Sequence, residues 1–430
     1  MAFCIKRLQF PASPLLVIVQ LFSRLQFCSP KKSKYITLQA KQQNMKSSIG
    51  YISNLTPLRG FAALMVVIYH FEEIAGRFVS AGDSMLIRKS YLMVDLFFIM
   101  SGFIIFHVYS KEFRAKIQRN SFSKFLVARF ARIYPLHFFM LLICVLIIAI
   151  AGVTPVFNPA AIPTHILLLQ SFGIHKIYTL NIPSWSISAE WWAYFLFPFI
   201  VLCLHKRKWL TITCSVLFVL AAYLSIMYLL PRTNPLDPTS PVPHDLDATF
   251  DFGFLRGFAG FMTGILLYLL YQWKDLKKIF SKDMLSVFSF AAMLTALHFG
   301  INDAFCIPIF ALMILSFACN KGFVTKVCSN RVLQYVGDIS YSIYMTQLII
   351  LFFVPPIIKA SGIEIPTMAG KSFAFVAGAL YCAFIVMLCV ALSSLTYYKI
   401  EVPLRTWINK KWAQRERFVY AVDNKFRKAS

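Results

Sequence analysis

Residues 133–153 read IYPLHFFMLLICVLIIAIAGV and contain no Asp, Glu, Lys or Arg. A helix of about 20 mostly apolar residues crosses a bilayer core that is about 30 Å thick. Lipid offers no hydrogen-bond partner to backbone groups, so an apolar stretch of this length has to be helical. This stretch therefore predicts a transmembrane helix.

Similar stretches occur along the rest of the chain, although the seventh and eighth of them are short. The predicted transmembrane helices cover residues 56–74, 90–109, 133–153, 188–204, 210–230, 253–272, 284–299, 304–319, 336–354 and 374–397. The sequence thus predicts an all-α integral membrane protein, a bundle of about ten transmembrane helices.

The composition agrees with a membrane protein. Of 430 residues, 58% are hydrophobic and 14% are charged, and the mean hydropathy is +0.66. About a quarter of a typical soluble domain is charged, so a soluble globular protein is excluded. The 10 cysteines form no CxxC pair, which favours buried apolar thiols over a disulfide framework or a metal site. We expect no bound metal.

The basic residues predict the orientation of the bundle. Alternate connections contain 26 Lys and Arg, against seven in the intervening ones. The basic set comprises residues 110–132, 205–208, 273–283, 320–335 and 398–430. Cytoplasmic loops carry such an excess, so both termini are predicted to be cytoplasmic. Orientation explains the net charge of +25, and no nucleic-acid partner is needed.

The domain organisation follows from the position of the first span. Residues 1–44 mix basic residues with a short apolar run and do not match the remainder of the chain. We predict that they form a disordered or wrongly assigned N-terminal extension, with Met45 as the natural start. The transmembrane domain then covers residues 45–405, and residues 406–430 form a basic cytoplasmic tail.

Ionisable groups inside spans are costly and therefore indicate function. Arg59 and His70 are 11 residues apart in the first span, on one helix face and about 16 Å apart along the axis. Arg59 is expected near the cytoplasm and His70 near the outer side. The alternative is that the Arg59 side chain extends to the lipid interface, and that His70 has a structural role with its hydrogen bonds made inside the bundle.

Two carboxylates are expected at the depth of His70. Asp95 lies in the second span and Glu190 in the fourth, both near the outer side. A carboxylate beside an imidazole fixes its tautomer and suits general-base catalysis. The alternatives are a structural ion pair between Asp95 and an arginine, and a helix-start role for Glu190 with Ser186 or Ser188 as the cap.

The cytoplasmic side has the opposite chemistry. Arg129 and Arg132 are at i and i+3 where the third span begins, and paired guanidinium groups bind phosphate. The alternative is simple anchoring by positive residues. Ser340 and Tyr341 lie at the inner start of the ninth span, where hydroxyl groups suit helix–helix contact as well as binding. Together these features favour a phosphate-bearing donor from the cytoplasm and an external acceptor.

Four ordered stretches resemble the acyltransferase-3 family of membrane O-acyltransferases. They are Leu58-Arg59-Gly60 through Tyr69-His70, Val94-Asp95-Leu96-Phe97-Phe98 through Ser101-Gly102-Phe103, Arg129 through Arg132 with Pro135, and Trp185-Ser186-Ile187-Ser188-Ala189-Glu190. Weaker matches follow around Ser340-Tyr341-Ser342 and at Glu401-Val402-Pro403. The family often has a histidine after the Ser-Tyr-Ser stretch, where this chain has Thr346-Gln347.

The resemblance implies the roles of these residues. His70, Glu190 and Asp95 are the expected catalytic group, with His70 as the base. The expected donor-binding residues are Arg59, Arg129 and Arg132. Further candidates from the same stretches are Trp185, Ser188, Ser340 and Tyr341.

The resemblance also implies the activity. An acyl group, expected to be acetyl, would pass from cytoplasmic acyl-CoA, typically acetyl-CoA, to a hydroxyl group of an extracytoplasmic carbohydrate or glycolipid such as O-antigen or exopolysaccharide. The expected location is the bacterial inner membrane, in contact with lipid and without a permanently bound cofactor. The family's fused extracytoplasmic domain is expected to be absent. The alternative is a proton-coupled multi-pass transporter, because such carriers also use intramembrane charges.

The outer connection 231–252 is rich in proline and aspartate. This composition predicts a solvated loop, with contact to an acceptor as the less favoured interpretation.

Overall fold

The computed structural model describes residues 51–75, 79, 83–152, 154, 156–232, 244–360 and 372–429. These residues form helices and connecting segments, with no strand among them, so the all-α prediction is confirmed for this part. The predicted N-terminal extension, residues 1–44, lies outside the described residues.

The helices follow one another along the chain with short connections. The α-helices are α4 (Leu55–Ala75), α5 (Met93–Tyr109), α6 (Arg119–Ala151), α7 (Ile162–Ile166), α8 (Trp185–Lys206), α9 (Lys208–Leu224), α10 (Gly253–Tyr271), α11 (Lys274–Phe280), α12 (Asp283–His298), α13 (Asp303–Cys319), α14 (Phe323–Cys328), α15 (Arg331–Asp338), α16 (Ser340–Ala360), α17 (Ser372–Thr396) and α18 (Val402–Ala429). Short 3₁₀ or π segments are η1 (Arg88–Leu92), η2 (Ser110–Phe113), η3 (Pro159–Ala161), η4 (Ile182–Ser184), η5 (Ser225–Leu229) and η6 (Tyr397–Glu401).

Several of these helices are long and apolar enough to cross a membrane. Within the described residues there are six such helices, or up to eight if two bent pairs each count as one span. The six cover Arg88–Phe113, Arg119–Ile150, Ile182–Lys206, Lys208–Leu229, Gly253–Tyr271 and Phe375–Glu416. This confirms a multi-pass membrane protein.

The remaining predicted spans are also helical but differ in kind. The pair α11 and α12 bends by 73°, and the pair α15 and α16 bends by 67°. Helix α13 is apolar but shorter than the other spans. Helix α4 has 21 residues, but Arg59, His70 and its acidic residues lower its apolar character. A count of ten transmembrane helices therefore stays a prediction.

The closest helix packing is between α5 and α10. A Cβ atom added to Gly264 would collide with the backbone oxygen of Ile99, and one added to Gly102 would collide with that of Phe261. Small residues allow membrane helices to approach this closely. The contact fixes the position of α5 side chains along the bundle relative to the N-terminal end of α10.

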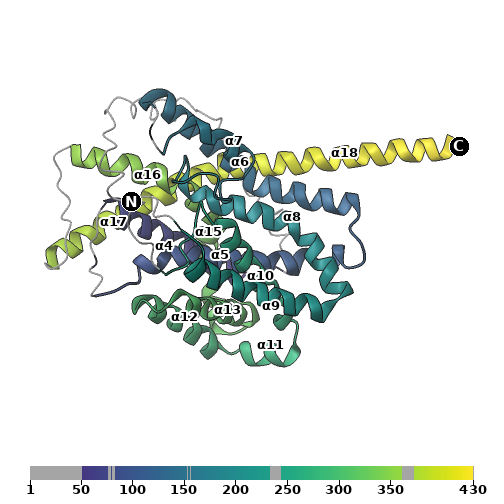
Figure 1. Ribbon diagram of the computed structural model, residues 1–430, viewed down its shortest axis with the longest axis horizontal. Coiled ribbons are helices and arrows are strands. Elements are labelled where there is room, and N and C mark those ends of the chain that lie inside the picture. Colours follow the sequence, from purple (N-terminus) through teal and green to yellow (C-terminus); the bar gives the residue numbers. More distant parts are fainter. Residues whose placement is uncertain are drawn as a thin grey trace.

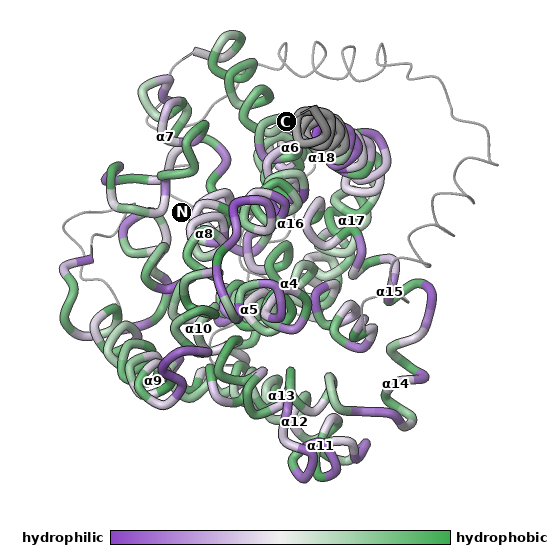
Figure 2. The backbone as a smooth tube through the Cα atoms, turned by 90° about the vertical axis from the view of Figure 1, so that its right-hand side faces the viewer, coloured by the Kyte–Doolittle hydropathy of each residue, from purple (hydrophilic) through white to green (hydrophobic). Residues whose placement is uncertain are grey.

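The helices form an elongated bundle from which α18 projects at one end (Figure 1). The α5–α6 and α8–α9 connections lie at that same end of the bundle. These connections and α18 belong to the basic set that the sequence assigns to one side of the membrane. In the view along the long axis, α4, α5, α8 and α16 lie centrally and α9, α12 and α15 lie at the periphery (Figure 2). That this end faces the cytoplasm stays a prediction.

Candidate functional site

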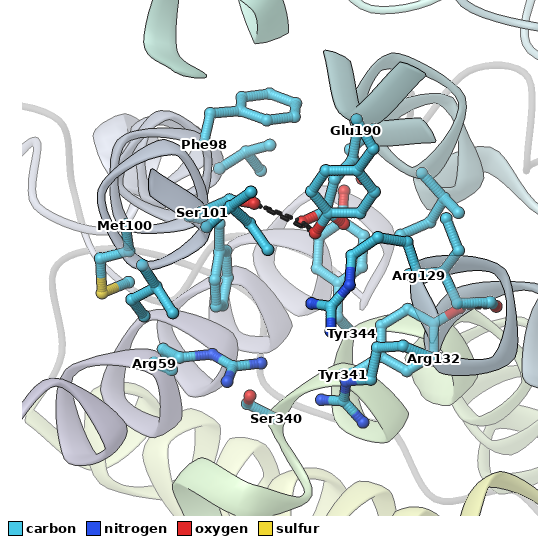
Figure 3. A pocket seen from close by; sticks show the side chains of 18 residues that line it. Arg59, Phe98, Met100, Ser101, Arg129, Arg132, Glu190, Ser340, Tyr341 and Tyr344 are labelled. Carbon is cyan, nitrogen blue, oxygen red and sulfur yellow. Dashed lines mark hydrogen bonds between the residues drawn. The ribbon is translucent and has the colours of Figure 1, made fainter. Parts of the chain in front are cut away.

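The three predicted donor-binding arginines line one cavity. This cavity, which we call the arginine cavity, has a volume of about 150 Å³ and is lined by residues of α4, α5, α6, α8 and α16. The guanidinium groups of Arg59, Arg129 and Arg132 extend into it from two helices far apart in sequence (Figure 3). The structure thus brings these three residues together.

Arg129 is held mainly by aromatic side chains. Its Nη2 donates to the hydroxyl of Tyr109 at 3.0 Å. The guanidinium lies 5.1 Å from the centre of the Tyr109 ring and 5.9 Å from that of Tyr194. Its Nε is buried without a hydrogen-bond partner among the described residues. The side chain therefore has donor capacity in the cavity wall that the protein does not use.

Arg132 has a carboxylate partner that the sequence analysis did not identify. It forms an ion pair with Glu401, and its guanidinium lies 5.3 Å from the centre of the Tyr341 ring. Glu401 is 1% exposed and also accepts a hydrogen bond from Ser342 at 2.8 Å. The π segment η6, which directly precedes α18, therefore fixes an arginine of α6.

Ser340 and Tyr341 belong to the arginine cavity because the chain bends between α15 and α16. Ser340 is the first residue of α16, and its buried hydroxyl has no hydrogen-bond partner in the described part of the chain. Figure 3 shows Ser340 between Arg59 and Arg132. Tyr341 donates its hydroxyl hydrogen to the Ile133 carbonyl. The first turn of α16 therefore forms part of the wall.

Glu190 lines the arginine cavity and does not line the cavity that contains His70, with which it was predicted to act. Ser101 donates to its Oε1 at 2.8 Å, and Tyr194 donates to the same oxygen. Helix α8 begins at Trp185 rather than at residue 188. Glu190 is therefore on the second turn, about 4.5 Å deeper than expected.

The serine cap expected for Glu190's helix is not present either. Ser186 donates to the Pro183 carbonyl at 3.1 Å, and Ser188 donates to the Leu168 carbonyl at 2.6 Å. Ser188 also hydrogen-bonds Ser171 at 2.8 Å. Ser188 lines neither cavity and instead attaches residues 168–171 to α8.

Asp95 is engaged in a structural ion pair, as the alternative interpretation proposed. Arg256 Nη2 lies 2.6 Å from Asp95 Oδ2, and both side chains are fully buried. Arg256 also packs on the Trp185 ring, with 5.3 Å between the guanidinium and the ring centre. Asp95 lines neither cavity, and its catalytic role stays a prediction.

His70 lines a second, smaller cavity of about 40 Å³, which we call the histidine cavity. Its Nδ1 lies 3.4 Å from Oε1 of Gln347. The cavity also contains Trp185, one of the predicted candidates, and Asp247 from the outer connection. His70 therefore meets an amide where the sequence analysis expected a carboxylate.

The two cavities share part of their walls. Val94 and Tyr344 line both of them, and the Tyr344 hydroxyl donates to the Pro183 carbonyl at 3.1 Å. The guanidinium groups and the imidazole are thus on opposite sides of one layer of side chains. Among the described residues, no group of three His, Cys, Asp or Glu side chains is arranged to hold a metal ion.

Several residues that line these cavities, or that contact residues lining them, were not predicted from the sequence. Ser101 and Glu401 lie in the motif stretches quoted above, and Arg256 is an ionisable group in a predicted span. These three carried the same signal as the predicted residues. Gln347 stands where the family often has a histidine, which marked a departure from the pattern but no role, and Asp247 is one of several aspartates in its connection.

A family profile described as an acyltransferase domain, of the acyltransferase-3 type, matches residues 52–396. The O-acetyltransferase OatA of Staphylococcus aureus (strain NCTC 8325 / PS 47) is 26% identical over 337 residues, which cover 71% of this chain and 51% of the relative. The peptidoglycan O-acetyltransferase OatA of Listeria monocytogenes serovar 1/2a is 22% identical over 344 residues, which cover 72% and 51%.

A shorter match is to protein 2 in the picA locus of Rhizobium radiobacter. It is 43% identical over 83 residues, which cover 19% of this chain and 38% of the relative. No solved structure matches the chain. The chain spans about half the length of the O-acetyltransferases that it matches.

Proposed function

Because the chain belongs to the acyltransferase-3 family, we propose that it is a membrane O-acyltransferase acting on a carbohydrate. It transfers an acyl group, acetyl in the first instance, from cytoplasmic acyl-CoA to a sugar hydroxyl on the outer side of a bacterial inner membrane. Two relatives are named O-acetyltransferases, and one of them is named for peptidoglycan. Peptidoglycan, O-antigen and exopolysaccharide are the acceptors to test.

The arginine cavity supports an anionic donor. Arg59, Arg129 and Arg132 place three cationic groups around one space, beside the first turn of α16. Guanidinium forks and helix N-termini both bind phosphate. At about 150 Å³, the cavity is smaller than the roughly 300–1,000 Å³ that encloses a whole ligand. It therefore takes part of the CoA molecule while the remainder lies outside.

The histidine cavity supports general-base catalysis. His70 removes the proton of the acceptor hydroxyl as its oxygen attacks the thioester carbonyl, so a C–O bond forms and the C–S bond breaks. The CoA thiolate leaves and then takes up a proton. Gln347 Oε1 favours a proton on His70 Nδ1, and in that tautomer Nε2 carries the lone pair of the base. Direct transfer and transfer through an acylated side chain both fit this role.

One observation carries the proposal. Cationic groups and an imidazole line two cavities that share Val94 and Tyr344. A donor and an acceptor that approach from opposite sides would meet at this layer. The carrier alternative needs ionisable groups that are free to exchange protons, whereas Asp95 and Glu401 are both paired with arginines.

The test uses the full chain purified in detergent, with two donors. Arg129→Gln is expected to weaken acetyl-CoA binding about tenfold, because a charged hydrogen bond is lost. Binding of S-acetylpantetheine without phosphates should not change. Lys124→Gln is the matched control, since Lys124 is exposed on the same helix outside both cavities.

His70→Ala tests the chemistry itself. Transfer should fall by about 10²-fold or more, while acetyl-CoA binding remains. The acceptor is identified by mass spectrometry of envelope glycans from strains with and without the gene. No acetyl difference between these glycans, together with no acetyl-CoA binding by the purified protein, would overturn the proposed function.

A further inference from the structure

We propose that the histidine cavity, at about 40 Å³, receives the hydroxyl-bearing edge of an acceptor sugar whose remainder lies outside it, and that Asp247 binds a hydroxyl group of that sugar. This inference rests on the proposed function, because the reacting hydroxyl has to reach His70. It assigns a binding role to the outer connection, which the sequence analysis interpreted as a solvated loop.

The walls of the histidine cavity are mainly aromatic. The rings that line it are those of Tyr69, Tyr91, Tyr178, Trp185 and Tyr344. Besides the tyrosine hydroxyls, the polar groups of the wall are His70, Asp247, Thr249 and Arg256. Aromatic faces pack against the C–H faces of sugars, and a few polar groups set the orientation of a ligand in such a site. This combination suits a neutral, hydroxyl-rich ring.

Asp247 is held in place from both sides. Its backbone N–H donates to Asp245 Oδ1 at 3.0 Å, and Asp245 is itself paired with Arg232 at 3.0 Å. The next residue after Asp247, Ala248, accepts a hydrogen bond from Arg256 at 3.2 Å. The loop around Asp247 is therefore a fixed part of the cavity wall.

The Asp247 carboxylate has capacity for a ligand. Its Oδ1 lies 3.2 Å from Arg256 Nη1, and its side chain is 28% exposed. The other carboxylate oxygen is not used in that ion pair. Arg256 already has a fully buried partner in Asp95 at 2.6 Å, so the charge of Asp247 is not required to neutralise it. A carboxylate accepts hydrogen bonds from hydroxyl groups, and these charged hydrogen bonds are strong.

The charge of Asp247 also distinguishes the ligand of the histidine cavity from that of the arginine cavity. The arginine cavity carries three guanidinium groups and one carboxylate, Glu190, whereas the histidine cavity carries, among the described residues, Asp247 near a single guanidinium, Arg256. Since Arg256 is paired with two carboxylates, this cavity disfavours phosphate and favours a neutral sugar. The acyl donor and the acceptor are thus assigned to different cavities by charge.

The experiment uses the full chain in detergent and the glycan isolated from a strain that lacks the gene. Asp247→Asn is expected to raise KM for this glycan about tenfold or more, because a charged hydrogen bond is lost. The dissociation constant of acetyl-CoA should not change. Asp247→Glu should restore part of the acceptor affinity. Asp83→Asn is the control, since Asp83 is an exposed carboxylate outside both cavities.

A pH profile adds a readout that a purely structural role would not affect. Burial raises the pKa of Asp247 to about 6. The carboxylate is therefore protonated as the pH falls through 6, and KM for the glycan should rise there in the wild type but not in Asp247→Asn. The charged and titratable groups around it are Arg232, Asp245 and Asp251 near the loop, Asp95 and Arg256 from α5 and α10, and Tyr69, His70, Tyr91 and Tyr178 in the cavity.

The outcomes separate the two proposals. Wild-type transfer with an unchanged KM for the glycan in Asp247→Asn would overturn this inference and leave the proposed function standing. So would a loss of acetyl-CoA binding in both Asp247 variants, because the residue would then be structural. An absence of transfer to any isolated glycan by the wild type would overturn the proposed function itself.

Discussion

Gln347 orients the imidazole of His70. The amide is fully buried, and its Nε2 donates to the Tyr344 carbonyl at 3.0 Å. That bond turns Oε1 towards His70 Nδ1, 3.4 Å away. Because the oxygen can only accept, it selects the tautomer with hydrogen on Nδ1.

Replacement of Gln347 should therefore affect the chemical step. Gln347→Leu is expected to lower kcat about tenfold, since part of the general-base contribution depends on the correct tautomer. Gln347→Glu keeps an accepting oxygen and should retain more activity than the leucine variant. Both are measured as acetyl transfer at saturating acetyl-CoA. Equal kcat in the wild type and Gln347→Leu would contradict this role.

At the scale of single residues, the rule that charges are costly in lipid predicted which residues belong to the site better than it predicted which of them contact one another. Arg59, Arg129 and Arg132 were predicted to act together and do line one cavity. Glu190 was predicted beside His70 and lies instead with the arginines. Which residues a side chain contacts depends on its position along the helix axis. A helix start that shifts by three residues changes this position, measured from the start of the helix, by about 4.5 Å.

At the scale of elements, the contact between α5 and α10 positions both cavities. It fixes Arg256 beside Asp95 and places Ser101 at the arginine cavity. The approach is possible because Gly264 faces the backbone of Ile99 without a side chain between them. A methyl group here meets atoms that cannot rotate away.

Gly264→Ala should therefore separate the two helices. We expect a loss of about 3 kcal/mol in the free energy of unfolding, the upper part of the usual range for overpacking. Acetyl-CoA binding should weaken as well. The control is Gly152→Ala, where a Cβ meets nothing within 4 Å and only the positive φ of 85° is costly. Unchanged thermal unfolding of Gly264→Ala in detergent would contradict this account.

Hydropathy predicted where the helices lie better than it predicted where they bend. Each of the ten predicted spans coincides with a helix or a bent helix pair, because apolar length is a local property. The bend of 67° between α15 and α16 was not predicted. It lies next to Gly337, where a side chain would collide with the Thr56 backbone of α4. A tertiary contact of this kind leaves no pattern in the sequence, although it places Ser340 at the cavity.

At the scale of the whole molecule, the two cavities differ in chemistry, so the bundle has two distinct sides. Arginine side chains line one cavity, and His70 with Asp247 lines the other. The α5–α6 and α8–α9 connections lie at the end from which α18 projects (Figure 1). If that end is cytoplasmic, the loop that contains Asp247 is outside.

Labelling of introduced cysteines tests this orientation directly. Lys111→Cys and Lys206→Cys are exposed positions at the basic end, whereas Asp83→Cys and His244→Cys lie in the other set of connections. A maleimide that does not cross membranes should label the latter two in intact cells and the former two only after permeabilisation, because positive connections stay inside. The unmodified chain supplies the background from its native cysteines. Labelling of all four in intact cells, or the reverse pattern, would contradict a cytoplasmic donor, since the arginine cavity would then be supplied from outside.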